Sequence, residues 1–170
     1  MKRILFTVLL AIPVASWTAS SSDWPMQDFD GDLQNLPSLQ NGLKLYANYC
    51  MGCHGLQFQR YERTADDLGI PHELAMKNLV FTGQKIGDLM HIGMSEEKAA
   101  SWFGAAPPDL TLVARSRSPA WIYTYLRNFY ADDSRPLGVN NRVYKDVGMP
   151  HALLDLQGLT KCAPGPVLAS

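Results

Sequence analysis

The chain has 170 residues, of which 46% are hydrophobic and 18% are charged, and its formal net charge is -1. A chain of this length can bury a core, and this composition excludes an intrinsically disordered protein. The net charge is close to zero and there is no basic run or stripe, so we expect no nucleic-acid partner.

The first residues are typical of a secretory signal peptide. Lys2 and Arg3 precede an apolar run over residues 4–14, and small residues follow as far as Ala19. This run is shorter than the about 20 residues that a membrane-spanning helix needs. We therefore expect a signal peptide over residues 1–19 that is removed on export, with an uncleaved N-terminal anchor as the alternative.

The signal is followed by an arm and then by a helix. Residues 20–37 are polar and acidic, and we expect them to be extended. Pro37 and Ser38 then introduce a helix with Ser38 as its cap, because serine is favoured at the N-cap position. Apolar residues recur at helical spacing as far as Cys50. The pattern predicts a helix that ends near Cys50.

The rest of the chain predicts short helices separated by loops. The expected features are a possible helix over 73–80, a helix capped by Ser95 that ends near Gly104, a break at Pro107-Pro108, a helix from Ser118-Pro119 to Asp132-Asp133, a long loop over 134–150, a last turn over 152–156 and an irregular tail over 159–170. Little of the chain alternates with the period of two that strands need. We therefore predict a mainly α fold.

A haem-attachment motif lies at the end of the first predicted helix. Cys50-Met51-Gly52-Cys53-His54 has the C-x-x-C-H spacing of c-type haem attachment. Two thiols at this spacing can reach vinyl groups on adjacent haem pyrroles, and the next residue can turn its imidazole onto the iron. We predict one covalent haem c, attached through Cys50 and Cys53, with His54 as an iron ligand. The host is then a cytochrome c-like helical haem domain with long loops over residues 38–158.

Two other uses of the cysteine pair have less support. A thioredoxin-like pair is expected after a strand, whereas this one follows a predicted helix. A zinc site needs four ligands, commonly including a second close pair. The chain offers only Cys162 and scattered histidines for that purpose.

The second axial ligand of the iron is expected to be Met149. It lies in Gly148-Met149-Pro150, where glycine permits a close backbone approach and proline stiffens the exit from the loop. The alternatives are that Met149 is a core residue and that His151, in the same loop, is the ligand. Other candidates have ordinary roles: His72 and His91 as surface or locally bonded residues, Met76 and Met90 as helix core, and Met94 as a packing residue before the Ser95 cap.

A His/Met pair determines what the iron can do. It fills both axial positions, so small molecules find no open site, and the thioether raises the reduction potential. The ligands therefore indicate electron transfer.

Several segments resemble the cytochrome c1 family in its shorter, bacterial form, in one order from about residue 24 to residue 158. They are residues 42–50 leading into the haem motif, Tyr61, residues 106–112, residues 115–117, residues 121–126 and residues 148–151. Members of this family normally end in a membrane-spanning helix, and this chain stops before one. We therefore expect a truncated chain without its anchor. Cys162 has no family role at this position.

The resemblance implies a subunit of the quinol–cytochrome c oxidoreductase, the cytochrome bc1 complex of the respiratory chain. It implies cytochrome b and a Rieske iron–sulfur protein as partners, with a soluble cytochrome c as acceptor. The location is then the periplasmic side of the bacterial inner membrane, reached through the complex. Such a subunit is not an enzyme on its own and has no catalytic residues.

Some site residues are carried over from the family by motif. Cys50 and Cys53 would hold the haem, and His54 and Met149 would ligate the iron. Pro108 would line the haem. Arg117 would pair with a haem propionate, or it is a solvated charge beside Arg115.

Two other functions compete with this one. The first is a free, soluble monohaem cytochrome c that shuttles electrons. The second is a haem enzyme or sensor with an open iron position, which requires that Met149 does not bind. Four acidic residues can steer a basic cytochrome c or form an ordinary solvated surface, namely Asp28, Asp30, Asp132 and Asp133.

Overall fold

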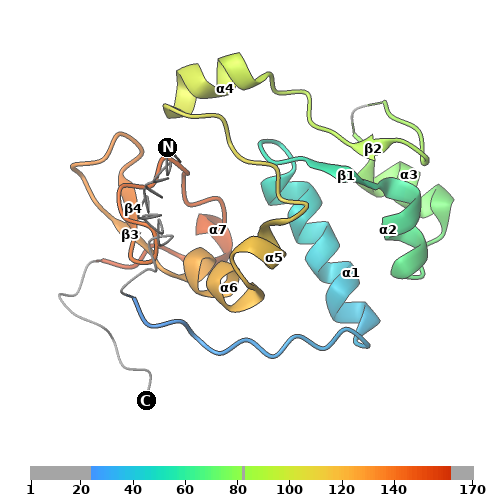
Figure 1. The fold of residues 1–170 in the computed structure, drawn as a ribbon, viewed down its shortest axis with the longest axis horizontal. Coiled ribbons are helices and arrows are strands. Elements are labelled where there is room, and N and C mark those ends of the chain that lie inside the picture. Colours follow the sequence, from blue (N-terminus) through green and yellow to red (C-terminus); the bar gives the residue numbers. More distant parts are fainter. Residues whose placement is uncertain (1–23, 82, 162–170) are drawn as a thin grey trace, which may run out of the picture.

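The computed structural model describes residues 24–81 and 83–161. These residues form seven α-helices, one π-helix and two small two-stranded sheets (Figure 1). The prediction of a mainly α, cytochrome c-like domain is confirmed. Within the described ranges, no helix has the length and apolar character to cross a membrane. The predicted signal peptide and Cys162 lie outside the described residues.

The first helical segment carries the haem motif at its C-terminal end. Helix α1 (Leu36–Leu45) continues directly into the π-helix η1 (Tyr46–Cys50). The predicted cap was wrong: the side chain of Asn35 accepts the Ser38 N–H at 3.1 Å, so Asn35 and not Ser38 caps the helix. Pro37 then lies in the first turn, where backbone N–H groups have no acceptor within the helix, so the N–H that proline lacks is not needed. The predicted end at Cys50 is confirmed, although the last turn is of the wider π type.

The next segment contains a small sheet that the sequence pattern did not predict. Strand β1 (Leu56–Arg60) pairs antiparallel with β2 (Leu89–Met90), with an irregularity in register along β1. Between them lie α2 (Tyr61–Asp67) and α3 (His72–Leu79), so the helix predicted over 73–80 is confirmed. Met90 is buried as expected, but it lies in a strand and not in a helix.

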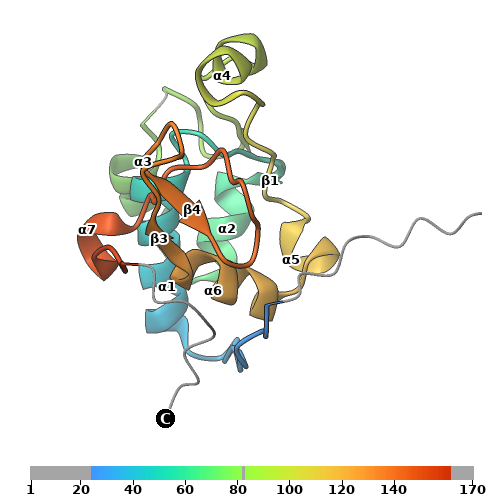
Figure 2. The same ribbon diagram turned by 90° about the vertical axis from the view of Figure 1, so that its left-hand side faces the viewer.

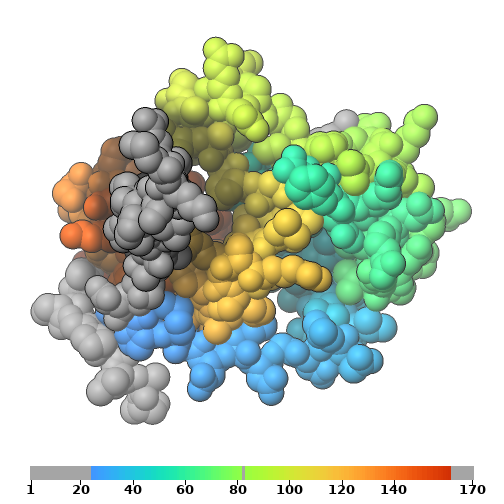
Figure 3. All heavy atoms as spheres, in the orientation of Figure 1, coloured from blue at the N-terminus to red at the C-terminus, as the bar shows by residue number. Residues whose placement is uncertain are grey.

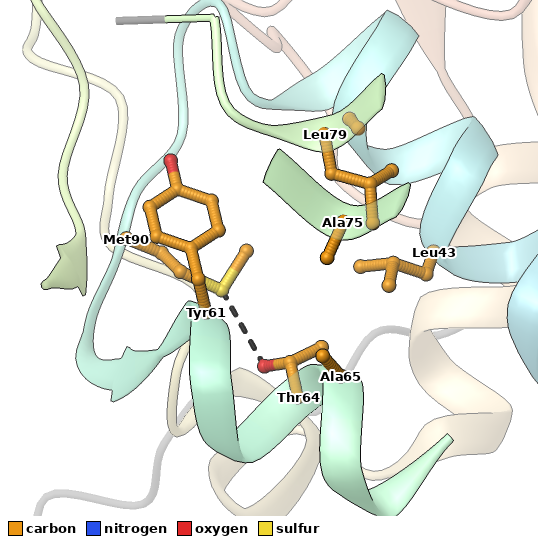
Figure 4. Close-up of a pocket in the computed structure, with 8 residues that line it drawn as sticks. Leu43, Tyr61, Thr64, Ala65, Ala75, Leu79 and Met90 are labelled. Atoms are coloured by element: carbon orange, nitrogen blue, oxygen red, sulfur yellow. Dashed lines mark hydrogen bonds between the residues drawn. The ribbon is translucent and has the colours of Figure 1, made fainter. Parts of the chain in front are cut away.

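A first apolar cluster forms under these elements. Its buried members are Met51, Tyr61 and Met90. A cavity of about 10 Å³ remains between α1, α2 and α3 (Figure 4), where the Thr64 hydroxyl donates to the Met90 sulfur at 3.5 Å. A cavity of this size holds about one water at most, so the cluster is nearly filled.

The second half of the chain begins with helices whose ends were predicted. Helix α4 (Glu96–Phe103) is capped by Ser95 and ends at Gly104, whose φ of 81° needs a glycine. A short helix α5 (Val113–Ser116) follows. Helix α6 (Pro119–Arg127) is capped by Ser118, whose hydroxyl accepts the Trp121 N–H at 3.2 Å. Helix α4 lies at the edge of the molecule in both views (Figure 1, Figure 2).

The predicted end of α6 was wrong. The helix stops at Arg127, and the next residues form β3 (Phe129–Ala131), which pairs antiparallel with β4 (Val139–Asn141). The apolar pattern continues through Phe129 and Tyr130, but these residues suit a strand as well as a helix. Pairing with β4 decides between the two. The last predicted turn is confirmed as α7 (Leu154–Gln157).

A second apolar cluster lies around β3 and β4. Phe129, Val139 and Val147 are buried, with Tyr125 and Met149 packed against them. The N-terminal arm covers α6, where the Gln27 N–H donates to the Thr124 hydroxyl at 2.8 Å and Phe29 packs on Tyr123 at 5.3 Å between ring centroids.

Two adjacent buried asparagines fix the loop that leads to Met149. The Asn141 amide oxygen accepts the N–H groups of Val143 at 2.8 Å and of Tyr144 at 3.3 Å. The Asn141 amide nitrogen donates to the Tyr125 carbonyl at 2.8 Å, which ties the loop to α6. The Asn140 amide oxygen accepts the Asp146 N–H at 2.9 Å.

Replacing Asn141 by alanine should destabilise the folded protein. The change leaves the N–H groups of Val143 and Tyr144 without their acceptor and removes one of the two hydrogen bonds to the Tyr125 carbonyl. We therefore expect a loss of about 2 to 4 kcal/mol in the free energy of unfolding. Urea unfolding of the haem-loaded protein measures it. Asn78→Ala is the matched control, because Asn78 is exposed on α3, and it should change stability by less than about 0.5 kcal/mol. Equal effects in the two variants would contradict the prediction.

Candidate haem site

The haem motif forms a tight turn at the end of η1. The N–H groups of Cys53 and His54 both donate to the Cys50 carbonyl, at 3.1 Å and 2.9 Å. Both thiols are half-buried and neither is in a disulfide. Burial raises the pKa of Cys50, and the neighbouring Cys53 adds to the rise. The turn thus presents two thiols and an imidazole within five residues.

His54 is held by a backbone carbonyl from a distant part of the chain. Its Nδ1 lies 2.7 Å from the Pro108 carbonyl oxygen. A carbonyl can only accept, so Nδ1 carries the proton and Nε2 is left with a lone pair suited to a metal. On the other side, the Tyr46 hydroxyl donates to the His54 carbonyl at 2.7 Å. Pro108 was expected to line the haem, and its contact with His54 was not foreseen.

The residues after His54 are fastened to those after Pro108. The Leu110 N–H donates to the Gly55 carbonyl at 2.9 Å, and the Gln57 N–H donates to the Asp109 carboxylate at 2.7 Å. Any Cβ at position 55 would lie 3.3 Å from both the Asp109 carboxylate and the Met90 carbonyl, so only glycine fits without a shift. We name these paired segments, residues 54–58 and 108–111, the histidine strap. One segment of the strap follows η1, and the other leads into α5 (Figure 1).

Asp109 is the charged group of the histidine strap. Burial tends to raise its pKa, but hydrogen bonds from the Thr111 hydroxyl and from the N–H groups of Gln57 and Thr111 outweigh burial, with a smaller contribution from His91. The pKa of Asp109 is therefore lowered. A carboxylate that accepts several hydrogen bonds stays ionised, and here it ties two separate segments together.

Met149 lies in the second apolar cluster, in contact with a hydroxyl group. Its sulfur accepts a hydrogen bond from the Tyr125 hydroxyl at 3.3 Å. Burial raises the pKa of Tyr125, and Tyr144 adds to the rise, so this hydroxyl keeps its proton. The preceding Gly148 is needed for packing: a Cβ there would lie 3.0 Å from the Phe103 carbonyl at the end of α4.

The histidines other than His54 have protein partners or lie on the surface. His151, the rival ligand, is buried and stacks on Phe129 with 4.8 Å between ring centroids and 5° between ring planes. Its Nε2 lies 3.2 Å from the Gly158 carbonyl and so acts as a donor. His72 is exposed and pairs with Asp66 at 2.7 Å. These contacts favour Met149 over His151 as a ligand.

Arg117 is exposed and lies over an aromatic ring. Its guanidinium is 5.3 Å from the centre of Trp121. Trp121 stacks on Tyr125 with 4.9 Å between centroids and 8° between planes. A continuous row of stacked groups therefore runs from Arg117 to the tyrosine that contacts Met149. The sequence placed Tyr125 in an apolar stripe but gave no sign of its hydroxyl contact.

The two sets of candidate ligands come from different parts of the fold. Met51, inside the haem motif, belongs to the first cluster, whereas Met149 packs on the second. Figure 3 shows a hollow near the middle of the molecule, bordered by the segment between α4 and α5. Among the described residues no three His, Cys, Asp or Glu side chains gather as a metal cluster. The thiol pair and the oriented imidazole fit a covalently attached haem, which is the mark of a c-type haem protein.

Comparison with known proteins identifies the family. The profile of the Cytochrome C1 family matches residues 23–157. The chain is 50% identical over 165 residues to the cytochrome c1 of Allochromatium vinosum, covering 97% of this chain and 67% of that one. It is 42% identical over 165 residues to the ammonia monooxygenase gamma subunit of Nitrosomonas europaea, covering 96% and 70%. It is 32% identical over 130 residues to the cytochrome c1 of Rhodospirillum rubrum, covering 66% and 47%.

The chain belongs to the cytochrome c1 family. This confirms the resemblance drawn from the sequence and the expectation of one covalent haem c. Proteins of this family are electron-transfer subunits of bc1-type complexes in respiratory chains, and they are not enzymes by themselves.

Asp109 should make the stability of the protein depend on pH. Its folded-state pKa lies below the unfolded value of about 3.9, so its contribution is fully present above that value. The contribution is lost as the pH falls through the lowered folded pKa. The difference in unfolding free energy between the wild type and Asp109→Asn should therefore be largest near pH 7 and shrink below about pH 4.

Urea unfolding of the haem-loaded protein between neutral and acid pH tests this. Asp133→Asn is the matched control, since Asp133 is an exposed carboxylate outside the histidine strap. A difference between the wild type and Asp109→Asn that stays constant with pH would show that the charge of Asp109 does not hold the strap.

Proposed function

We propose that this chain transfers single electrons through a haem c that is attached to Cys50 and Cys53 and ligated by His54 and Met149. The observation that carries the proposal is the 2.7 Å contact between His54 Nδ1 and the Pro108 carbonyl oxygen. This contact fixes the imidazole tautomer and leaves Nε2 as the ligand atom, as expected for a histidine bound to a metal.

The chain's own residues hold and orient the redox centre. When bound, the haem supplies an iron that alternates between two oxidation states and so carries one electron. The Cys50 and Cys53 thiols anchor its edge, and the histidine strap keeps the His54 ring in one orientation. Met149 would supply the second iron ligand, and its thioether would favour the reduced state.

We propose further that the donor is a Rieske iron–sulfur protein and that the acceptor is a soluble cytochrome c. The chain then works beside cytochrome b in a quinol–cytochrome c oxidoreductase on the periplasmic side of the inner membrane. Support comes from the family and from a relative named cytochrome b/c1 in Bradyrhizobium diazoefficiens, which is 29% identical over 116 residues. On this proposal the segment over residues 1–19 directs export.

Three exposed acidic residues suit a basic acceptor. Asp28 and Asp30 lie in the N-terminal arm, and Asp133 follows β3. Asp132 differs, because it accepts hydrogen bonds from Ser134 and Asn140 that lower its pKa. We therefore assign steering to Asp28, Asp30 and Asp133, and a structural role in the β3–β4 loop to Asp132.

The name of the Nitrosomonas relative, ammonia monooxygenase gamma subunit, suggests oxygen chemistry for that protein. In this chain a His54/Met149 pair would leave the haem iron without an open position for oxygen or another small molecule.

The absorption spectrum tests the ligand assignment. The oxidised wild type, exported with haem-maturation machinery, should show the weak far-red band of sulfur-to-iron charge transfer, and Met149→Leu should lose it. The reduced variant should also bind carbon monoxide, because one axial position becomes open. Met94→Leu is the matched control and should keep the band. A band that survives Met149→Leu, or a wild type without one, would reject the assignment and favour a haem protein with an open site.

The salt dependence of electron transfer tests the acceptor. Reduced protein mixed with a basic soluble cytochrome c should oxidise at a rate that falls steeply as ionic strength rises. Asp28→Asn with Asp30→Asn should slow the reaction at low salt by roughly threefold or more and have little effect at high salt. Stopped-flow absorbance measures both. A rate that is indifferent to salt and to the double substitution would leave these residues as ordinary solvated surface.

A further inference from the structure

We propose that Tyr125 is a positioning residue that raises the reduction potential of the haem by donating a hydrogen bond to the Met149 sulfur. This inference rests on the proposed function, because it requires Met149 to be the axial ligand. The observation is the 3.3 Å contact between the Tyr125 hydroxyl and the Met149 sulfur. Tyr125 itself does not touch the iron and acts through the ligand.

This contact stands out among similar ones. Of the three hydroxyl–sulfur contacts in the described residues it is the shortest: Thr64 and Met90 are 3.5 Å apart, and Tyr61 and Met51 are 3.9 Å apart. Those two lie in the first cluster around Met90 and Tyr61. Only the Tyr125 contact involves the methionine proposed as the ligand.

The Tyr125 ring is held on several sides. Trp121 stacks on one face at 4.9 Å, and Phe129 packs edge-on at 5.3 Å with 71° between the ring planes. The backbone carbonyl of Tyr125 accepts the Asn141 amide at 2.8 Å. Because Asn141 also holds the loop that leads to Met149, the donor and the acceptor of the hydroxyl–sulfur bond are anchored to the same side chain. The hydroxyl is therefore aimed at the sulfur before any change at the iron.

Such a hydrogen bond shifts the redox equilibrium in a definite direction. It draws electron density from the sulfur, and the oxidised iron depends on that donation more than the reduced iron does. The positive end of the O–H dipole also points toward the sulfur, which would disfavour the higher charge of an oxidised iron bound to that sulfur. Both effects favour the reduced state, so removing the hydroxyl should lower the potential.

The experiment compares Tyr125→Phe with the wild type, both as exported, haem-loaded full chain. We expect the equilibrium constant for reduction to fall by about three- to tenfold, which is about 28 to 59 mV for a one-electron couple. The far-red sulfur-to-iron band should shift or weaken in the same variant. Tyr123→Phe is the matched control, because Tyr123 lies on the same helix and its hydroxyl pairs with Arg127. It should leave both readouts unchanged.

A double-substitution cycle tests whether the effect passes through Met149. Leucine accepts no hydrogen bond, so Tyr125→Phe should have no further effect on the potential once Met149→Leu is present. An equal shift in that background, or in Tyr123→Phe, would overturn the inference, as would an unchanged potential in Tyr125→Phe. A wild type that lacks the far-red band would instead reject the proposed function. A wild type with the band and a Tyr125→Phe variant with a wild-type potential would reject the role of Tyr125 alone.

Discussion

The His54 ring is held by a carbonyl that lies 54 residues away along the chain. This hydrogen bond selects the imidazole tautomer, and the tautomer decides which ring nitrogen can bind a metal. The Pro108 carbonyl stays in place because two more hydrogen bonds join the segments of the histidine strap. The Leu110 N–H donates to the Gly55 carbonyl, and the Gln57 N–H donates to the Asp109 carboxylate. The chemistry of a five-residue motif therefore depends on a long-range pairing between two loops, and glycine at position 55 allows them to approach.

The second half of the site is built by different means. Met149 follows a loop that has little regular structure, yet two buried asparagines fix its course through hydrogen bonds to its backbone and to α6. Gly148 brings the loop against the end of α4. The two apolar clusters are separate, with the haem motif in one and Met149 on the other. A haem bound by residues of both clusters would join the two halves of the fold.

An aromatic row connects the surface to this second half. Arg117 lies over Trp121, Trp121 stacks on Tyr125, and Tyr125 contacts Met149. The contact of Arg117 with a ring differs from that of a free surface charge, and it leaves the outer face of the guanidinium to solvent or to an anionic group. Family membership identifies the cofactor and the general role of the chain. On our proposal, this row of side chains is how the chain adjusts Met149 as an iron ligand.

The features that depend on local interactions could be predicted from the sequence alone. The cysteine spacing, the caps at Ser95 and Ser118, and the glycine at the end of α4 each depend on residues within a few positions of one another. The strands, the end of α6 at Arg127, the Pro108 carbonyl and the Tyr125 hydroxyl were decided only by the tertiary structure. Each is a pairing between distant segments, and the same residues would suit a helix, a loop or a core if their partners lay elsewhere. The sequence by itself thus determined which groups can hold a haem, whereas the fold decided how they are oriented.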